Sequence, residues 1–497
     1  MKRIAIIGGG ISGLAAAHRL IELSKTTQQP IKITILESSS RLGGTIQTED
    51  REGFVLERGP DSFISEKPEA VALARRLKID SQLIETNNQH RRSFIIRNGK
   101  LRPVPEGFQL LAPSRFWPFI STDIFSMLGK LRMSADLLLP RKGVNGSSDE
   151  SLASFVRRRL GQQALERMAQ PMVGGIYTAD PEVLSLRATL PRFLDMERDH
   201  RSLILGMWRK GRANKNQTGV SGARYSLFLS FDRGMKVLVD ALEKNMANLV
   251  ESGLAETEVR LNTSVSGVER GANGWILRTS AGIVSEFDAV CLATPSYGAA
   301  KLLSEIAPQL AAKLGQIRFA STATINLAYR RSDISHKLDG FGFVVPFVEK
   351  RSVIACTFSS IKFQGRAPED HILLRAFVGG ALQPEMLSLA DGEITRRVEE
   401  DLQQLLGITG KPLFGEVSRW MNSMPQYEVG HLDRVAEIEN ALEQLPGLVL
   451  AGNSYRGAGI PDCIRSGEAA AQSLIERISH GVRGDGVTER RGDGVSG

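Results

Sequence analysis

Three closely spaced glycines near the start of the chain have the spacing of a phosphate-binding loop. Gly8, Gly10 and Gly13 follow directly after the apolar run at residues 4–7, which is typical of a strand buried on both faces of a parallel sheet. There, Gly8 permits a tight turn, Gly10 lets the backbone approach a pyrophosphate, and Gly13 lets a helix pack closely on the strand. The pattern predicts a nucleotide site at a helix N-terminus, formed by Gly8, Gly9, Gly10, Ile11, Ser12 and Gly13.

The elements that must position this loop follow in order. Residues 14–20 have the apolar periodicity of a helix, and a second apolar run at 33–36 ends at Glu37. A carboxylate at the end of the second strand can accept both ribose hydroxyls of an adenosine. Because strand, glycines, helix, strand and acid occur together, an ordinary glycine-rich turn explains the pattern poorly.

The segment after Glu37 favours FAD over NAD. It contains a second glycine pair, for which a nicotinamide enzyme has no special need. It resembles the segment that runs along the flavin phosphates and ribityl chain in flavoproteins of the glutathione reductase and amine oxidase type. Such a segment needs close backbone approach and a cation near the phosphates. We therefore expect the FAD site to include Ser38, Arg41, Gly43, Gly44 and Thr45.

Length and composition bound the class of protein. A chain of 497 residues with 42% hydrophobic and 24% charged residues predicts a soluble protein of two or three domains. It has no apolar run of eighteen residues, and its start lacks the pattern of a signal peptide. The three cysteines are far apart and suit small buried residues in a reducing cytoplasm. The net charge of +8 permits nucleic acid, an anionic membrane or anionic small molecules as partners.

The rest of the chain predicts further units. Residues 94–103 favour a hairpin around Asn98 and Gly99 with basic flanks, and residues 108–200 favour an inserted helical domain. The aromatic and leucine residues of that domain predict either a membrane-facing surface or a plain helical core, and both alternatives stay open. The basic run at 157–159 is expected on a solvated helix face. Strand patterns at 289–293 and 448–453 return to the nucleotide sheet, and those at 320–380 predict a separate antiparallel sheet.

The predicted fold is α/β, with a glutathione-reductase-type FAD-binding Rossmann domain, an antiparallel-sheet substrate domain and an inserted helical domain. The FAD-binding domain is expected at 1–90, 250–300 and 430–478, and the substrate domain at 91–107, 201–249 and 301–429. The helical, membrane-associating domain is expected at 108–200. Residues 479–497 repeat Gly-Asp-Gly-Val, have nothing to bury and are expected to be disordered.

Several segments together resemble one family, the oxygen-dependent protoporphyrinogen and coproporphyrinogen oxidases of haem synthesis, which are FAD enzymes of the amine oxidase superfamily. The likeness runs from residue 1 to about residue 478. It rests on the nucleotide motifs above and on residues 58–63, 171–180, 340–343, 425–427 with Gly430 and His431, and 452–463.

The resemblance implies roles for particular residues. The expected FAD-lining positions are Gly59, Pro60, Asp61, Ser62, Val265, Trp420, Gly452, Ala458, Gly459 and Ile460. The helix after residue 464 would point its N-terminus at the flavin and stabilise negative charge there. The expected substrate contacts are Phe341 and Val344, which core packing would otherwise explain, and the backbone of Gly175.

One position departs from part of the family. Animal and plant members that oxidise protoporphyrinogen have an arginine directly before the first aromatic residue of the hairpin, whereas this chain has Ser93. Ser93 resembles the bacterial branch that oxidises coproporphyrinogen. Its four propionates would be met by several scattered cations, for which Arg91 and Arg92 are the nearest candidates and Lys67 a further one.

The resemblance therefore implies removal of hydride from a porphyrinogen, of the coproporphyrinogen III or protoporphyrinogen IX type, by FAD. Dioxygen is the expected acceptor, giving hydrogen peroxide, because no second glycine motif for NAD is present. No metal is expected. Other expected partners are an anionic membrane surface at the inner face of the cell membrane and a ferrochelatase-type enzyme, but not nucleic acid. An amine oxidase, a carotenoid desaturase and a non-catalytic nucleotide-binding carrier are the alternatives.

Overall fold

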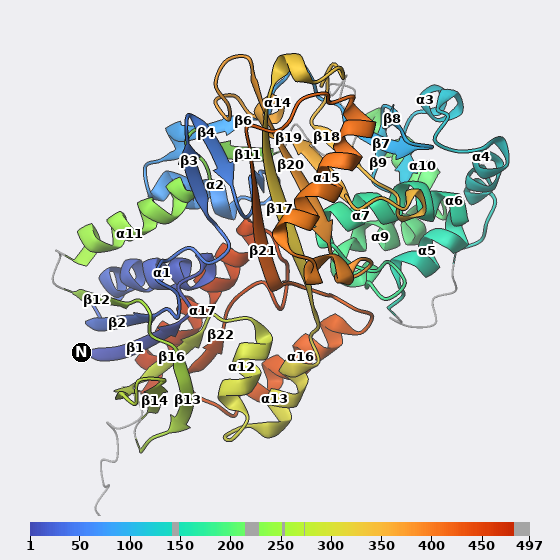
Figure 1. Ribbon diagram of the computed structural model, residues 1–497. Helices are drawn as coiled ribbons and strands as arrows, with labels where there is room; N and C mark the ends of the chain where they lie inside the picture. The colour runs from blue at the N-terminus through green and yellow to red at the C-terminus, as the bar shows by residue number, and fades with distance from the viewer. Residues whose placement is uncertain (142–148, 214–227, 251–253, 273, 482–497) are drawn as a thin grey trace, which may run out of the picture.

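The computed structural model describes residues 1–141, 149–213, 228–250, 254–272 and 274–481 (Figure 1). Most of the tail expected to be disordered, residues 482–497, therefore lies outside the described residues. The last helix continues to Gly481, two residues beyond the expected start of that tail. Within the described ranges, no helix combines the length and the apolarity needed to cross a bilayer.

A five-stranded parallel sheet forms the nucleotide-binding part, at the left in Figure 1. Its strand order is β12 (Ala255–Arg260), β2 (Ile31–Leu36), β1 (Lys2–Ile7), β16 (Ala289–Leu292) and β22 (Leu448–Leu450). The sequence expectations for the two N-terminal strands and for the two later strands that return to this sheet are confirmed. Because β1 is apolar on both faces, Ile4 and Ile6 pack into one core and Ala5 and Ile7 into another.

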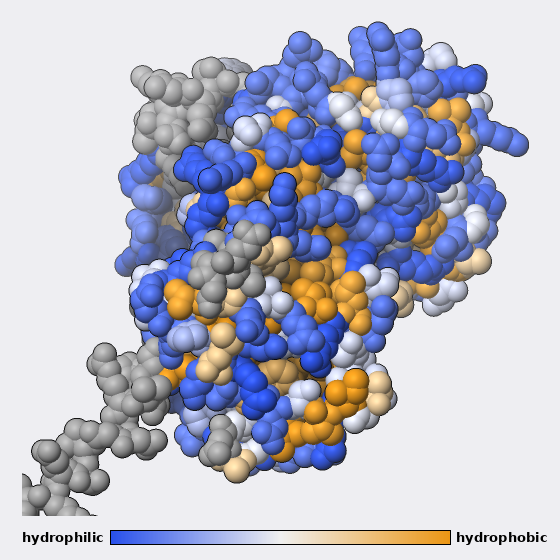
Figure 2. All heavy atoms as spheres, turned by 90° about the vertical axis from the view of Figure 1, so that its left-hand side faces the viewer, coloured by the Kyte–Doolittle hydropathy of each residue, from blue (hydrophilic) through white to orange (hydrophobic). Residues whose placement is uncertain are grey.

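Helices cover both faces of this sheet. The first core contains α1 (Ile11–Thr27), α11 (Lys236–Val250) and α17 (Ile460–Gly481). The second contains the small sheet of β13 (Val265–Arg270), β14 (Trp275–Thr279) and β15 (Val284–Phe287), with α12 (Ser296–Leu303), α13 (Pro308–Gly315) and α16 (His431–Leu442). The outer surface of this part, which faces the viewer in Figure 2, is mainly hydrophilic with separate apolar clusters.

A seven-stranded sheet forms the centre of the molecule (Figure 1). Its order is β21 (Phe414–Pro425), β17 (Phe319–Arg330), β20 (His371–Gly379), β19 (Ala355–Phe358), β18 (Gly342–Val344), β7 (Phe94–Arg97) and β8 (Lys100–Pro103). All neighbours are antiparallel except β18 and β7, which pair in parallel, so the expected antiparallel sheet contains one parallel pair. The predicted hairpin at Asn98 and Gly99 is confirmed, since both residues have positive φ between β7 and β8. Helix α15 (Asp391–Leu406) packs on one face.

Helices at the right in Figure 1 form a third core around Phe155 and Phe193. They are α3 (Phe116–Ser121), α4 (Met127–Ser134), α5 (Leu152–Arg159), α6 (Gln162–Ala164), α7 (Gln170–Tyr177), α8 (Leu186–Thr189), α9 (Pro191–His200) and α10 (Leu203–Ala213), with a π-helical turn at Leu165–Ala169. Both alternatives for the apolar residues of this part have a counterpart in the structure. Most of them fill the core, but a set on α3, α4 and the following turn is exposed.

The expectation that residues 157–159 form a solvated face is wrong for two of the three arginines. Arg157 is exposed, but Arg158 is partly buried between Glu150 and Glu197, and Arg159 is fully buried against Asp136. The helix presents successive residues to different neighbours, and Arg159 projects inward between α4 and α9.

The remaining elements connect these parts. They are β3 (Thr48–Arg51), β4 (Phe54–Glu57), β5 (Phe63–Ile64), α2 (Glu69–Arg76), β6 (Leu83–Glu85), β9 (Phe108–Gln109), β10 (Ala112–Pro113), β11 (Phe228–Phe231) and α14 (Ser359–Lys362). Short 3₁₀ turns lie at Asp80–Gln82, Ala135–Leu137, Arg331–Asp333, Phe347–Glu349 and Pro384–Ser388.

Residues 201–249 do not pack as one unit with the central sheet, where they were expected. Leu203 and Met207 join the helical core, whereas Phe231 and Leu238 join the core of the nucleotide sheet. The expected helical and strand cores are therefore bridged by this segment. The apolar faces of α10 and α11 decide its position, because each buries its stripe on a different neighbour.

Candidate functional site

The glycine loop lies where β1 meets α1, and its glycines have distinct geometric reasons. Gly8 has a φ of +108°, and a Cβ on it would lie 2.6 Å from the Ala293 carbonyl oxygen. A Cβ on Gly13 would lie 2.0 Å from the Gly8 carbonyl oxygen. A Cβ on Gly10 would meet only the Gly44 Cα, at 3.9 Å. The fold therefore requires glycine at 8 and 13, while the space beside Gly10 is open.

The open space beside Gly10 faces the start of α1, which also carries Ile11 and Ser12. No side chain of the described structure caps this helix, so its first backbone N–H groups are available to an anion. These observations fit the pyrophosphate of a dinucleotide. They agree with the position that sequence reasoning gave to the clamp.

Glu37 ends β2 beside the same loop. Its carboxylate accepts hydrogen bonds from the backbone N–H of Gly9 at 2.6 Å and of Ser39 at 2.8 Å, and the Ser38 hydroxyl is 3.3 Å away. Because each carboxylate oxygen has two lone pairs, Glu37 keeps acceptor capacity toward a ribose. Val265 lies in β13, two residues after Thr263, whose N–H donates to the Glu37 carbonyl at 2.8 Å.

The second glycine pair crosses the first. The Gly43 N–H donates to the Gly9 carbonyl at 2.8 Å, and Gly44 approaches Gly10 so closely that a Cβ on Gly44 would lie 3.1 Å from the Gly10 Cα. Arg41 donates to the carbonyls of Leu42 and Gly44, at 3.0 and 2.6 Å. Arg41 thus braces this segment from within, in addition to providing charge near the loop.

The segment at residues 59–62 adjoins this crossing. A Cβ on Gly59 would lie 1.7 Å from the Thr45 carbonyl oxygen, so the two segments pass in direct backbone contact. The Trp420 indole N–H donates to the Arg58 carbonyl at 2.8 Å. The structure therefore brings together Thr45, Trp420 and the segment that contains Gly59, Pro60, Asp61 and Ser62.

A cluster of buried charges lies behind residues 59–62. The Lys362 ammonium contacts Asp61 at 2.9 Å and the Ser62 hydroxyl at 3.2 Å, and the Arg375 guanidinium donates to the Gly59 carbonyl. Burial would raise the pKa of Asp61, but Lys362 and Arg375 together lower it well below its usual range. Asp61 therefore serves as a buried anchor for the segment.

Glu57, two residues before this segment, has the opposite shift. Burial raises the pKa of its carboxyl to about 7, although it accepts from the Met235 N–H at 2.7 Å and the Thr48 hydroxyl at 2.8 Å. Its proton occupancy therefore changes near neutral pH.

The loop before α17 closes the nucleotide site from a third direction. The Gly452 N–H donates to Ser466 at 3.0 Å, and the loop contains Ala458 and Gly459 before Ile460 begins the helix. Helix α17 packs closely on α1, since a Cβ on Gly467 would lie 2.1 Å from the Ser12 carbonyl oxygen. The N-termini of both helices therefore belong to one closely packed pair.

The residues expected to contact substrate form a separate group. A Cβ on Gly175 would lie 3.5 Å from the Val344 side chain, and the Phe341 N–H donates to the Arg92 carbonyl at 2.8 Å. Gly175 comes from α7 of the helical part, whereas Val344 belongs to β18 of the central sheet. The group therefore spans the junction of these two parts.

The candidate cations differ in their partners. Arg92 binds Asp339, with its Nη2 atom 2.9 Å from the carboxylate and its Nε donating to the carbonyl at 2.8 Å. The Nε atom of Arg91 is buried and has no hydrogen-bond partner in the described structure. Lys67 binds Asp462 of α17 at 2.5 Å, away from the hairpin.

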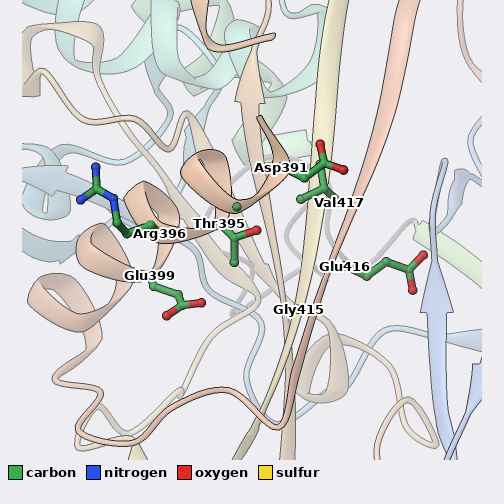
Figure 3. Close-up of a pocket in the computed structure, with 8 residues that line it drawn as sticks. Asp391, Thr395, Arg396, Glu399, Gly415, Glu416 and Val417 are labelled. Atoms are coloured by element: carbon green, nitrogen blue, oxygen red, sulfur yellow. The ribbon is translucent and has the colours of Figure 1, made fainter. Parts of the chain in front are cut away.

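A hollow of about 510 Å³ lies elsewhere, between α15 and β21 (Figure 3). It is open to solvent and contains none of the residues predicted for the site. Figure 3 shows Thr395, Arg396 and Glu399 on the helix and Glu416 directed toward the opposite side of the strand. We assign it no role in the chemistry.

Sequence reasoning missed Lys362 and Arg375. Arg375 gave one signal, because it interrupts the apolar strand at 372–378, where a charged residue needs a buried partner. Sequence reasoning quoted Tyr427 and His431 as motif residues but gave them no function. The structure places both beside the loop at residues 452–459.

Comparison with known proteins now adds an independent observation. Residues 11–475 match the family model described as flavin containing amine oxidoreductase. The chain belongs to this family. It is an oxidoreductase, and FAD is its cofactor. The open cradle at Gly10, the uncapped start of α1 and the carboxylate of Glu37 fit that cofactor.

Individual relatives match over almost the whole chain. Coproporphyrinogen III oxidase of Bacillus subtilis (strain 168) is 36% identical over 475 residues, covering 95% of this chain and 98% of the relative. Protoporphyrinogen oxidase 1, chloroplastic, of Arabidopsis thaliana is 29% identical, covering 95% and 87%. The crystal structure of a protein from Exiguobacterium sp. 255-15 superposes with a TM-score of 0.82 at 32% identity, covering 96% and 99%. The predicted α/β fold class is confirmed.

Proposed function

We propose that this protein is an FAD-dependent porphyrinogen oxidase of haem biosynthesis, and that coproporphyrinogen III is its preferred substrate. The observation that carries this proposal is the match of 95% of the chain to a coproporphyrinogen III oxidase at 36% identity. Ser93 supports the choice of substrate, because the protoporphyrinogen-oxidising members of the family have arginine there. Protoporphyrinogen IX is the second candidate.

The residues of the clamp bind and orient the cofactor. Residues 8–13 and the glycine pair 43–44 face the pyrophosphate and Glu37 the ribose. Residues 59–62, Trp420 and the loop before α17 surround the flavin ring. The chemistry that FAD supplies when bound is two-electron oxidation with removal of hydride from a methylene bridge. The N-terminus of α17 then favours the negative charge that accumulates.

The second group of residues orients the macrocycle. Gly175, Phe341 and Val344 provide an apolar wall at the junction of α7 and β18. Arg91 and Arg92 stand at the end of the hairpin that pairs with β18 and would meet the propionates. Each round removes one hydride from carbon and one proton from a pyrrole nitrogen. Dioxygen takes up two electrons and two protons and leaves as hydrogen peroxide.

Turnover by the purified holoprotein tests this proposal. Coproporphyrinogen III, which is colourless, should become red-fluorescent with stoichiometric oxygen uptake, and protoporphyrinogen IX should react more slowly. An amine or carotenoid substrate gives no such fluorescence. Purified protein without a flavin spectrum would favour the non-catalytic carrier, and flavin-bearing protein that oxidises neither porphyrinogen would refute the proposal.

We also propose that the helical part contacts an anionic membrane surface on the cytoplasmic side. Support comes from exposed apolar side chains on α3, α4 and the turn after them, at the right edge of Figure 1. This apolar patch consists of Phe116, Trp117, Ile120, Met127, Leu128, Leu131 and Leu138. A product released at a membrane could pass directly to a ferrochelatase-type enzyme. Co-sedimentation with vesicles tests the contact.

A further inference from the structure

Residues 425–431, between β21 and α16, form a connection that the proposed reaction does not yet use. We call them the strap. Its two central aromatic residues are buried, with Tyr427 at 2% and His431 at 0% exposure. Their rings stack with centroids 4.2 Å apart. The strap therefore has a fixed position between its neighbours on both sides.

One side of the strap is bound to the helical part. The Tyr427 carbonyl accepts from the Ser185 N–H at 2.7 Å, and the Val429 N–H donates to the Val183 carbonyl at 2.9 Å. The Gln426 amide donates to the carbonyl of Tyr177 at 3.3 Å. Tyr177 is the last residue of α7, the helix that carries Gly175 beside Val344. This side of the strap thus follows the position of the expected substrate wall.

The other side of the strap is bound to the loop at residues 452–459, before α17. The Tyr427 hydroxyl donates to the Asn453 carbonyl and accepts from the Gly457 N–H at 2.9 Å. The His431 Nε2 atom lies 2.8 Å from the Tyr455 carbonyl, so this nitrogen carries the proton. Burial lowers the pKa of His431 to about 4, and its ring is therefore neutral at pH 7. One hydroxyl group ties both ends of the loop that is expected to line the flavin.

We propose that Tyr427 is a positioning residue that couples occupancy of the substrate pocket to FAD binding, an inference that rests on the proposed function. Its backbone is held by the helical part and its hydroxyl holds the loop before α17, so a displacement of α7 by a macrocycle at Gly175 moves both together. Coupling of this kind is reciprocal: a porphyrin that tightens FAD binding is itself bound more tightly when FAD is present.

The test is the FAD dissociation constant of the purified protein, measured by ultrafiltration with and without coproporphyrin III, the aromatic product. In the parent, coproporphyrin III should tighten FAD binding about fivefold or more, the range typical of coupled sites. In Tyr427→Phe, which keeps the ring stack but loses both hydroxyl hydrogen bonds, this factor should fall toward one. Gln426→Leu, which releases only the Tyr177 contact, should reduce the factor while leaving FAD affinity without porphyrin unchanged.

Tyr329→Phe is the matched control. Tyr329 is also buried, but its hydroxyl has no hydrogen-bond partner among the described residues, so this variant should keep the parental factor. A Tyr427→Phe protein that binds coproporphyrin III and shows the same factor as the parent would overturn the inference and leave the proposed function intact. A parent that turns over neither porphyrinogen and binds no coproporphyrin III would instead overturn the proposed function and the inference with it.

Discussion

Gly10 and Gly13 belong to one motif, but a side chain at each would fail for a different reason. A Cβ on Gly13 collides with the Gly8 carbonyl inside the protein, whereas a Cβ on Gly10 enters open space that the pyrophosphate needs. We therefore expect Gly10→Val to fold and to lose FAD. The protein should be colourless after purification, with a thermal unfolding midpoint equal to that of parent apoprotein.

Gly392→Val is a suitable control for this variant. Gly392 also has open space around its Cβ position but lies in α15, remote from the clamp, so this protein should stay yellow. Gly13→Ala should show the contrasting defect, a lower unfolding midpoint in the apoprotein itself. Full FAD content in Gly10→Val would disprove the assignment of the open space to the cofactor.

Glu57 makes stability depend on pH near neutrality. Burial raises its pKa to about 7 in the folded state, from 4.5 in its ordinary environment. Between these values the folded protein holds a proton that the unfolded chain has lost, so the free energy of unfolding falls as pH rises. In Glu57→Gln this loss is absent.

From pH 5 to pH 8 the parent should therefore lose about 2 kcal/mol more stability than Glu57→Gln. Urea unfolding of the two apoproteins at a series of pH values measures this difference. Parallel stability curves for parent and variant would show that Glu57 is ionised throughout that range.

The residues that sequence could predict for the site share a local signal. The clamp and Glu37 were predictable because glycine spacing, apolar runs and a terminal acid lie within one short stretch. Lys362 and Arg375 were not, because they meet Asp61 only when strands 300 residues apart in sequence come together. The same holds for Tyr427, whose partners lie on both sides of it in the chain.

At the scale of elements, the buried pair of Arg159 and Asp136 joins α5 to the turn after α4. Both side chains have zero exposure, and Arg159 also donates to the carbonyls of Pro140 and Arg201 at 2.9 and 2.7 Å. Removing one member of such a pair leaves an uncompensated buried charge. Arg159→Met should therefore lower the free energy of unfolding by about 3 to 5 kcal/mol.

Arg157→Met tests whether position on α5 alone explains that loss. Arg157 pairs with Glu182, and both side chains are exposed, so its removal should cost about 1 kcal/mol or less. Chemical denaturation of the two variants gives the comparison. Equal losses would mean that the ion pair of Arg159 contributes nothing beyond its helix position.

The apolar patch on α3 and α4 predicts a second element-level effect. Trp117 and Leu128 are 77% and 78% exposed, which leaves their side chains free to enter a lipid interface. The double variant Trp117→Ser, Leu128→Ser should lose most of the protein that co-sediments with phosphatidylserine vesicles and keep its turnover in solution. Ile283→Ser, an exposed apolar residue in another part, should sediment like the parent. If the parent itself does not sediment, the patch has another use.

At the scale of the whole molecule, the sequence predicted the nucleotide sheet and the hairpin better than the path of the chain between the parts. Periodic apolar runs identify a strand, and the order of strands follows from the parallel arrangement. The division of residues 203–249 between two cores was not predictable, because α10 and α11 have similar apolar faces and only their tertiary partners differ. The buried side of α5 was missed for the same reason.

The charge of the whole molecule bears on the choice between two substrates. Arg92 is already bound to Asp339, whereas the Nε atom of Arg91 has no partner in the described structure. A partly desolvated carboxylate paired with arginine contributes about 1.5 to 3 kcal/mol. Arg91→Ala should therefore raise the Michaelis constant for coproporphyrinogen III about tenfold, with little change in turnover.

This loss should be smaller for protoporphyrinogen IX, which has two propionates instead of four, and should shrink as salt screens the charge. Arg91→Lys should recover part of it. Arg198→Ala removes the same charge from an exposed site on α9 and should leave both Michaelis constants unchanged. If Arg91→Ala binds coproporphyrinogen III as well as the parent at low salt, the hairpin does not recognise propionates through this residue. Arg102, which is bound to Asp123 on the same hairpin, would then be the next residue to test.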